Sequence, residues 1–202
     1  METLPSLQAA AAHESEEADK IILQHACMAG GATLIVGIFP CTAGLDIAFA
    51  IPILYGMYTR INSTMNIAFT KHKVQSIAKM VGANVLGNIA AFVLAKIVVG
   101  ICRWIPGVHL VAAGIDAGTN AVVMYICGKV YRMVIANLQG AGRELSPETI
   151  REEMEGIIND PGKMKELKRE AKERMKGQKF KEYKGAAEEV KKSYEEDSDL
   201  KD

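Results

Sequence analysis

The feature that most limits the fold of this chain is a long apolar stretch from residue 21 to residue 139. It contains two acidic residues, Asp46 and Asp116, against eight basic ones, whereas residues 1–20 and 140–202 are densely charged. Such a stretch must be buried in a protein core or in lipid, because its exposure to water is unfavourable. The formal charge of the 202-residue chain is zero, so its overall charge gives no support for nucleic acid as a partner.

Proline and glycine divide the apolar stretch into four helical segments. The first pair is residues 20–39 and 45–69, and the second is residues 74–104 and 109–138, with a polar break at residues 71–73. The turn within the first pair contains Pro40, and the turn within the second contains Pro106 and Gly107. Pro52 comes early enough in its segment to kink the helix without ending it. The sequence therefore predicts an all-α fold with two hydrophobic helical hairpins joined by Pro/Gly turns.

The two hairpins resemble each other, which indicates an internal repeat. The residues that recur in order are Pro40, Asp46, Gly56, Tyr58 and Arg60 in the first half and Pro106, Asp116, Gly128, Tyr131 and Arg132 in the second. An aspartate in such a place can cap a helix, pair with a basic residue of another helix, or serve as an ion or proton site. We interpret Asp46 and Asp116 as structural anchors, together with Pro40, Pro106 and Gly107.

Small residues recur at helical spacing within the apolar stretch. Two rows step by four residues and predict close helix packing: Ala83, Gly87, Ala91 and Ala95, and Ala113, Ala117 and Ala121. Such rows are the usual contact surface between helices in lipid, although tightly packed soluble bundles also use alanine faces. We expect these faces to mediate self-association into homo-oligomers.

The apolar segments vary in their suitability to span a bilayer, which needs about 20 mainly apolar residues. Hairpins that enter one leaflet fit the segments with Asp46 and Asp116 better than four complete spans do. Seven basic residues would then suit an anionic lipid surface: Arg60, Lys71, Lys73, Lys79, Arg103, Lys129 and Arg132. The alternative interpretation of these seven is an ordinary solvated face.

The chain divides into three parts by composition. Residues 1–19 are acidic and predicted to be flexible, residues 20–139 form the hydrophobic helical domain, and residues 140–202 form a charged helical tail with a disordered end. In the tail, Ser146 precedes Pro147 and Asp160 precedes Pro161, and both pairs are typical helix starts. A narrow apolar stripe predicts one packing seam, either on the same chain or on a second copy. Its residues at three- and four-residue spacing are Met164, Leu167 and Ala171, and then Phe180, Tyr183, Ala187, Val190 and Tyr194.

The sequence gives little sign of a reaction. It has no phosphate-binding glycine loop, no paired Cys/His cluster for zinc and no framed serine nucleophile, so we expect no enzyme activity, cofactor or metal. The N-terminus has neither a basic region nor an apolar region of a signal peptide, and the four cysteines form no CxxC pair. We therefore expect reduced thiols and an intracellular, membrane-associated location.

The second hairpin resembles the DUF697 family, a domain of unknown function. The residues that carry the resemblance are WIPGVHLVAAGIDAGTNAVVMYICGKVYRMVI (104–135), and IFPCTAGLDIAFAIPILYGMYTRI (38–61) is similar to the proline-then-aspartate segment of that family. The resemblance covers about residues 18–138. It implies a membrane location and an association with Era-like GTPases. Since this chain has no GTPase domain, a nucleotide-dependent role would require a separate GTPase as partner.

Two functional interpretations follow. The first is a non-enzymatic membrane-associated helical protein that inserts hairpins into lipid, with anionic lipid as a partner, and self-associates through small-residue faces. The second is a soluble all-helical self-assembling or adaptor module that partners a separate GTPase. A third and weaker interpretation makes Asp46 and Asp116 part of an ion or proton path.

Overall fold

The protein is entirely helical in the part that the structure describes. The computed structural model describes the backbone of residues 4–37, 45–88 and 109–176, and the side chains of residues 14–32, 50–81 and 117–175. The helices are α1 (Leu4–Gly37), α2 (Leu45–Thr64), α3 (Lys71–Asn88), α5 (His109–Gly140), α6 (Pro147–Ile158) and α7 (Pro161–Lys176). No strand occurs among these residues, which confirms the predicted fold class.

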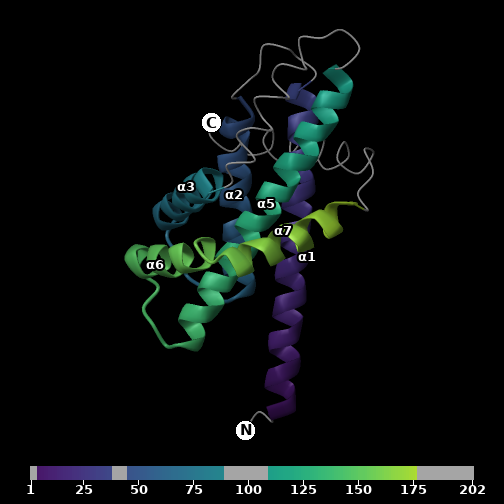
Figure 1. Ribbon diagram of the computed structural model, residues 1–202. Helices are drawn as coiled ribbons and strands as arrows, with labels where there is room; N and C mark the ends of the chain where they lie inside the picture. The colour runs from purple at the N-terminus through teal and green to yellow at the C-terminus, as the bar shows by residue number, and fades with distance from the viewer. Residues whose placement is uncertain (1–3, 38–44, 89–108, 177–202) are drawn as a thin grey trace, which may run out of the picture.

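The bundle is built around α5. Helices α1 and α5 pack along each other, α2 packs on α1, and α6 and α7 lie across the later part of α5 (Figure 1). Because α5 has neighbours on several sides, a continuous run of its residues from 124 to 131 is buried. A helix that is apolar around its whole circumference is expected in such a central position.

The hairpin arrangement is only partly visible. α1 and α2 pack together as the first hairpin requires, and α2 continues through Pro52 as predicted. However, α5 packs more extensively on α1 than on α3, and α3 also contacts α2 and α6. The predicted polar break at residues 71–73 is wrong, because these residues form the first turn of α3. The second predicted turn and the end of the 74–104 segment lie outside the described residues.

The acidic N-terminal residues are helical. α1 begins at Leu4, so residues 4–19 continue directly into the apolar part of the helix and do not form a separate flexible segment. Two features explain this result: the alanines at 9–12 are strong helix formers, and Lys20 forms an ion pair with Glu16 one turn earlier at 2.9 Å. Ala18 is also fully buried, which attaches this part of α1 to the bundle.

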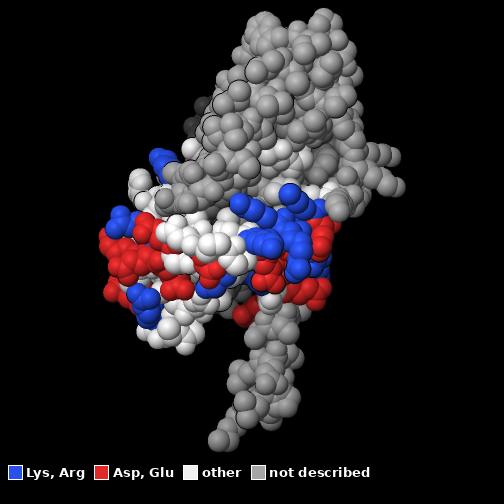
Figure 2. Space-filling model, in the orientation of Figure 1, with Lys and Arg blue, Asp and Glu red and all other residues white. Residues whose placement is uncertain are grey.

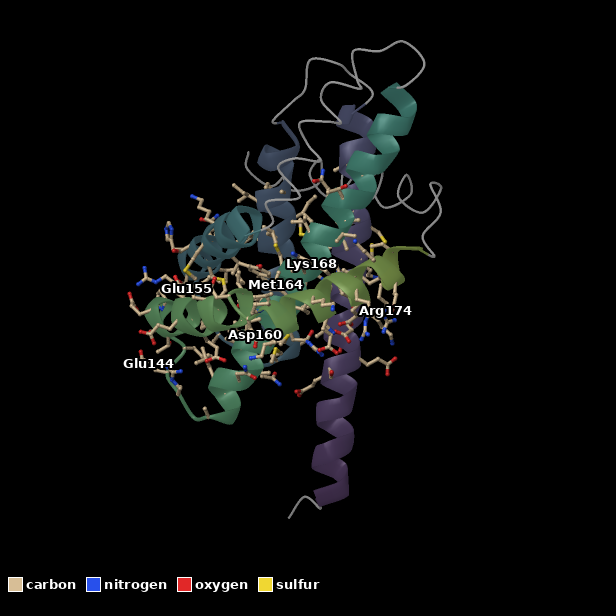
Figure 3. The ribbon with its side chains drawn as sticks, viewed as in Figure 1. Glu144, Glu155, Asp160, Met164, Lys168 and Arg174 are labelled. Atoms are coloured by element: carbon tan, nitrogen blue, oxygen red, sulfur yellow. The ribbon has the colours of Figure 1, made fainter. Side chains whose placement is uncertain are left out.

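Both predicted helix starts in the tail are confirmed. At α6, the backbone N–H of Thr149 donates to Ser146 Oγ at 3.2 Å, and the Ser146 N–H donates to Thr149 Oγ1 at 3.0 Å. At α7, the N–H groups of Gly162 and Lys163 donate to Asp160 Oδ1 at 2.8 and 3.1 Å. Asp160 therefore satisfies N–H groups that have no partner within the helix, at the junction labelled in Figure 3.

The tail helices α6 and α7 dock on the same chain, which is one of the two arrangements predicted from the sequence. The predicted stripe is buried at Met164, Leu167 and Ala171, and α6 and α7 both pack on α5. The outer faces of the two helices carry charges, and Figure 2 shows acidic side chains gathered over the α6 side of the molecule. Residues 147–175 are therefore part of one core with the apolar stretch and not an independent appendage.

Among the described residues, one stretch is long and apolar enough to cross a membrane. It is Ala117–Gly140 in α5, and 67% of its most apolar part is buried inside the protein. Its neighbours α6 and α7 have charged outer faces, such as Glu148, Arg151 and Glu155 on α6. Most of this stretch is therefore covered by other parts of the chain.

Candidate functional site

A cluster of charged side chains joins α1, α5 and α7. Lys129 Nζ lies 3.4 Å from Asp19 Oδ1 and 3.1 Å from Glu170 Oε1. The Tyr125 hydroxyl donates to Glu170 Oε1 at 2.8 Å. Arg132 Nη1 lies 3.5 Å from Asp19 Oδ1. The central cation on α5 thus holds one carboxylate from α1 and one from α7, which we call the Lys129 cluster.

The charges of the Lys129 cluster are stabilised by their neighbours. Burial raises the pKa of Glu170, but the hydrogen bonds from Tyr125 and Lys129 and the positive charge of Lys129 outweigh it and lower the pKa. Glu170 therefore stays ionised at neutral pH. Burial, together with the hydrogen bond to Glu170, raises the pKa of Tyr125, so its hydroxyl remains a donor. The cluster is a closed set of partners that holds α7 in place.

The location of Lys129 differs from the predicted one. Only 7% of Lys129 is exposed, so it is not one of the lipid-surface bases that the sequence predicts. Arg132 is partly buried, and its Nη1 donates to Ser15 Oγ at 2.6 Å. Both residues are covered by α1 or α7. The sequence of the apolar stretch alone does not reveal that these helices cover them. Asp19 and Glu170 were missed because each lies in a densely charged segment.

A second polar group lies inside the bundle between α2 and α5. The rings of Tyr58 and Tyr131 stack with centroids 4.0 Å apart and planes at 19°. The Tyr58 hydroxyl donates to the Cys127 carbonyl oxygen at 3.2 Å, and the Tyr131 hydroxyl donates to Asn62 Oδ1 at 2.6 Å. Burial raises the pKa of both tyrosines, so they act as neutral donors. The two tyrosines that matched in the sequence repeat are therefore in direct contact.

His25 is a buried histidine on α1 that faces α2. Its Nδ1–H donates to the Ile21 carbonyl oxygen at 2.8 Å, and 4% of the residue is exposed. Burial lowers the pKa of His25 from its ordinary value of 6.5, the backbone hydrogen bond opposes this shift, and the charge of Arg60 adds to it. His25 is therefore neutral in the folded protein at neutral pH.

The lowered pKa of His25 predicts a loss of stability in mild acid. The unfolded chain takes up a proton on this imidazole as the pH falls below 6.5, while the folded chain takes it up only at a lower pH. We therefore expect the thermal midpoint to fall as the pH drops below 6.5. The lowered pKa of Glu170 also reduces stability in acid, but only in a separate range below pH 4.5. In His25→Gln this drop should shrink, and in His72→Gln, which replaces an exposed residue, it should persist. An equal drop in wild type and His25→Gln would contradict this assignment.

The buried thiols are poorly suited to catalysis. Cys27 and Cys127 are buried and form no disulfide, as predicted, and Cys41 and Cys102 lie outside the described residues. Burial raises the pKa of the Cys127 thiol to about 12, so it carries almost no thiolate at neutral pH. Among the described side chains, no group of three or more His, Cys, Asp or Glu residues could hold a metal ion.

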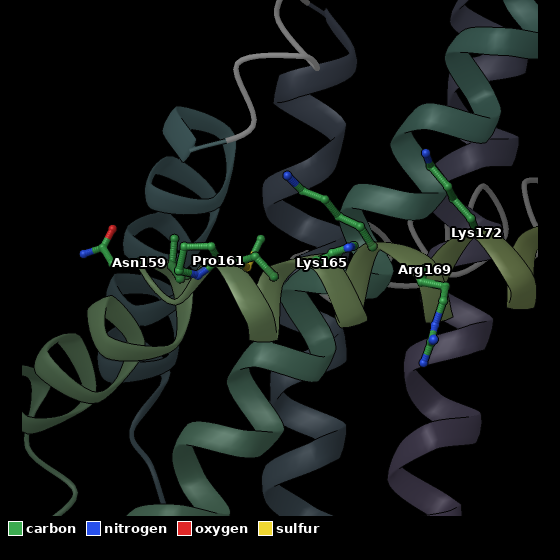
Figure 4. A pocket seen from close by; sticks show the side chains of 8 residues that line it. Asn159, Pro161, Lys165, Arg169 and Lys172 are labelled. Carbon is green, nitrogen blue, oxygen red and sulfur yellow. The ribbon is translucent and has the colours of Figure 1, made fainter.

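The surface of the described residues includes two hollows. A groove of about 390 Å³ between α1 and α5 includes Glu14, Arg132 and Asn137. A larger groove of about 720 Å³ follows α7 from the α6–α7 junction, and four of its residues are basic: Lys165, Lys168, Arg169 and Lys172. Figure 4 shows this groove, with Lys172 and Arg169 directed to opposite sides of α7. The larger groove therefore has a basic lining.

The structure describes the side chains of only some of the residues predicted as anchors or as packing rows. Asp46, Asp116, Ala83, Gly87 and Ala113 lie in α2, α5 or α3, where their side chains are outside the described residues. Further predicted residues lie wholly outside the described residues: Pro40, Pro106, Gly107, Ala91, Ala95 and Arg103. Ala117 and Ala121 are buried within the chain itself.

The predicted lipid-surface bases on α2 and α3 are mostly exposed. Arg60, Lys71 and Lys79 are exposed, whereas Lys73 is half-buried with its Nζ 4.3 Å from the centre of the Phe69 ring. Their exposure fits a solvated face as well as a lipid surface.

Comparisons with family models, curated proteins and solved structures found no match to this chain.

Proposed function

We propose that this chain is a non-enzymatic membrane-associated helical protein. Its described helices form a water-facing bundle, and its most apolar segments enter lipid at one end of that bundle. The observation that carries the proposal is the convergence of three helix ends. The end of α1 and the beginnings of α2 and α5 lie at the same end of the molecule, opposite the N-terminus (Figure 1).

The sequence that adjoins these helix ends in the chain is strongly apolar. Residues 33–49 and 82–116 contain four charged side chains, namely Asp46, Lys96, Arg103 and Asp116. In contrast, α6, α7 and the exposed part of α1 are rich in charge. Ile51 is the exposed large hydrophobic residue among the described side chains, and it lies in α2 close to residues 33–49 in sequence. A charged bundle that carries such apolar segments is typical of a protein that sits on a membrane through those segments.

Self-association is a further part of this proposal. Ala117 and Ala121 are already covered within the chain, so they are not available to a second copy. The row Ala83, Gly87, Ala91 and Ala95 then becomes the surface for contacts between copies in lipid.

Liposome flotation of the full chain tests the membrane proposal. We expect the chain to float with vesicles of phosphatidylcholine alone and to remain bound at high salt, because apolar insertion does not depend on charge. Replacing Val98 and Ile101 by Glu should abolish flotation, since two acids in the apolar segment oppose insertion. The control replaces exposed Ala136 and Gln139 on α5 by Glu and should float like wild type. A wild-type chain that remains unbound would contradict the proposal.

The burial of α5 favours a second candidate function. In Ala117–Gly140, 67% of the most apolar part is covered by protein. The second candidate is therefore a soluble all-helical self-assembling or adaptor module that partners a separate GTPase. In that case the wild-type chain would not float, and it would behave as a discrete particle without detergent. The same flotation experiment therefore distinguishes the two candidates.

A further inference from the structure

Three lysines lie on one flank of α7. Lys165, Lys168 and Lys172 are separated by three and four residues, which places them on the same side of a helix. Lys165 and Lys172 are exposed, and Lys168 is half-buried. They border the groove of about 720 Å³ together with Ile158, Pro161 and Met164. We call these three residues the lysine flank.

The rotation of α7 is fixed, so the lysine flank points in one direction. The apolar stripe of α7 is buried on the bundle, and Glu170 is tied to Lys129 and Tyr125. Figure 3 places Lys168 and Arg174 on opposite sides of α7. In Figure 4, Lys172 extends towards the side on which α1 ends and α5 begins, while Arg169 extends the other way.

The lysine flank has no carboxylate partner within the described part of the chain. Six other described cations do have one: Lys20, Lys129, Arg132, Arg143, Arg151 and Arg169 all lie within 4.0 Å of an acidic oxygen. A row of uncompensated lysines attracts anions, and Figure 2 shows basic side chains gathered over α7. The lysine flank is therefore a positive surface on the side of α7 on which α1 ends and α5 begins.

We propose that the lysine flank binds the headgroups of anionic phospholipids when the apolar segments enter the membrane. α7 lies across the direction of α1 and α5, so it can lie along the membrane surface while those helices point towards it (Figure 1). Lysines on such a helix extend their charged ends to the headgroups, and the apolar floor of the groove accommodates the adjoining lipid surface. This inference rests on the proposed membrane association and adds to it the class of lipid and the residues that select it.

The test compares the partition of two triple variants of the full chain onto vesicles. The first is Lys165→Gln, Lys168→Gln and Lys172→Gln. The control is Lys20→Gln, Arg151→Gln and Lys163→Gln, which removes the same charge from exposed residues outside the lysine flank. Each variant is mixed with phosphatidylcholine vesicles that either contain or lack phosphatidylserine, at low and high salt.

We expect the first variant to bind phosphatidylserine vesicles on the order of 100-fold more weakly than wild type at low salt, since each lysine near an anionic surface contributes about fivefold. Its binding to vesicles of phosphatidylcholine alone should be unchanged. The control variant should lose much less of its binding to phosphatidylserine vesicles. Equal losses of binding in both variants would overturn the proposed role of the lysine flank, but not the proposed membrane association. Failure of wild type to bind either kind of vesicle would overturn both proposals.

Discussion

Lys129→Met should lower the free energy of unfolding by about 3 kcal/mol, because it removes the cation between two carboxylates in a poorly solvated place. Lys129 contacts Asp19 of α1 and Glu170 of α7, and 9% of its side chain is exposed. Methionine keeps the length and the apolar contacts of the stem, so the loss comes mainly from the charge. The two carboxylates are about one third exposed, which places the loss at the lower end of the range for a broken buried ion pair.

Thermal unfolding measures this effect. For a chain of this size, about 3 kcal/mol corresponds to roughly 6–12 °C in the thermal midpoint. Lys20→Met is the matched control, because Lys20 and its partner Glu16 are both 69% exposed. Such exposed ion pairs contribute about 0–1 kcal/mol to the free energy of unfolding. Adding Glu170→Gln to Lys129→Met should recover part of the loss, since it removes the unpaired charge and keeps an acceptor for Tyr125. Equal effects of Lys129→Met and Lys20→Met would show that the Lys129 cluster does not hold the helices together.

Gly128→Ala should destabilise the protein by about 2 kcal/mol, although alanine is the better helix former. A methyl group at this position would lie 2.8 and 2.9 Å from Ile22 Cγ1 and Cγ2 and 2.9 Å from Met57 Sδ. Met57 is flexible, but Ile22 is β-branched and both of its close atoms are bonded to Cβ, so it cannot turn away. α1 would have to move away from α5, and this separation would loosen the contact on which the bundle is built.

Gly118→Ala is the control for Gly128→Ala in the same helix. An added methyl group at Gly118 meets no atom within 4 Å, so only helix propensity acts. This variant should be stabilised by about 1 kcal/mol. Opposite signs in the two thermal midpoints are therefore expected, and a stabilised Gly128→Ala would show that α1 and α5 are not in close contact.

The local structure of the tail was predictable from short sequence signals. Ser146 and Asp160 each precede a proline and then act as caps, because a short polar side chain can accept the first N–H groups of a helix. The stripe at Met164, Leu167 and Ala171 is buried because three- and four-residue spacing brings these side chains to one face. These predictions depend on neighbours in sequence, so they needed no knowledge of the tertiary structure.

Other predictions failed because they depended on contacts between distant segments. Lys129 was assigned to the surface from its charge, but its partners Asp19 and Glu170 are 110 and 41 residues away in the chain. The acidic residues before position 20 were assigned to a flexible segment from composition alone, yet Ser15 and Asp19 bind Arg132 of α5. Charge and composition do not show which other helix will cover a side chain.

The sequence alone determined that this protein is helical, where its tail helices begin and which residues form their buried stripe. These properties follow from the chemistry of neighbouring residues and the 3.6-residue period of a helix. Only the tertiary structure decided that α7 docks on α5, that Gly128 lies against Ile22, and that Lys129 is enclosed while Lys165, Lys168 and Lys172 have no carboxylate partner among the described residues. The physical reason is that the docking of α7 fixes which of its charged flanks meets α1 and α5, and this depends on the packing of all three helices together.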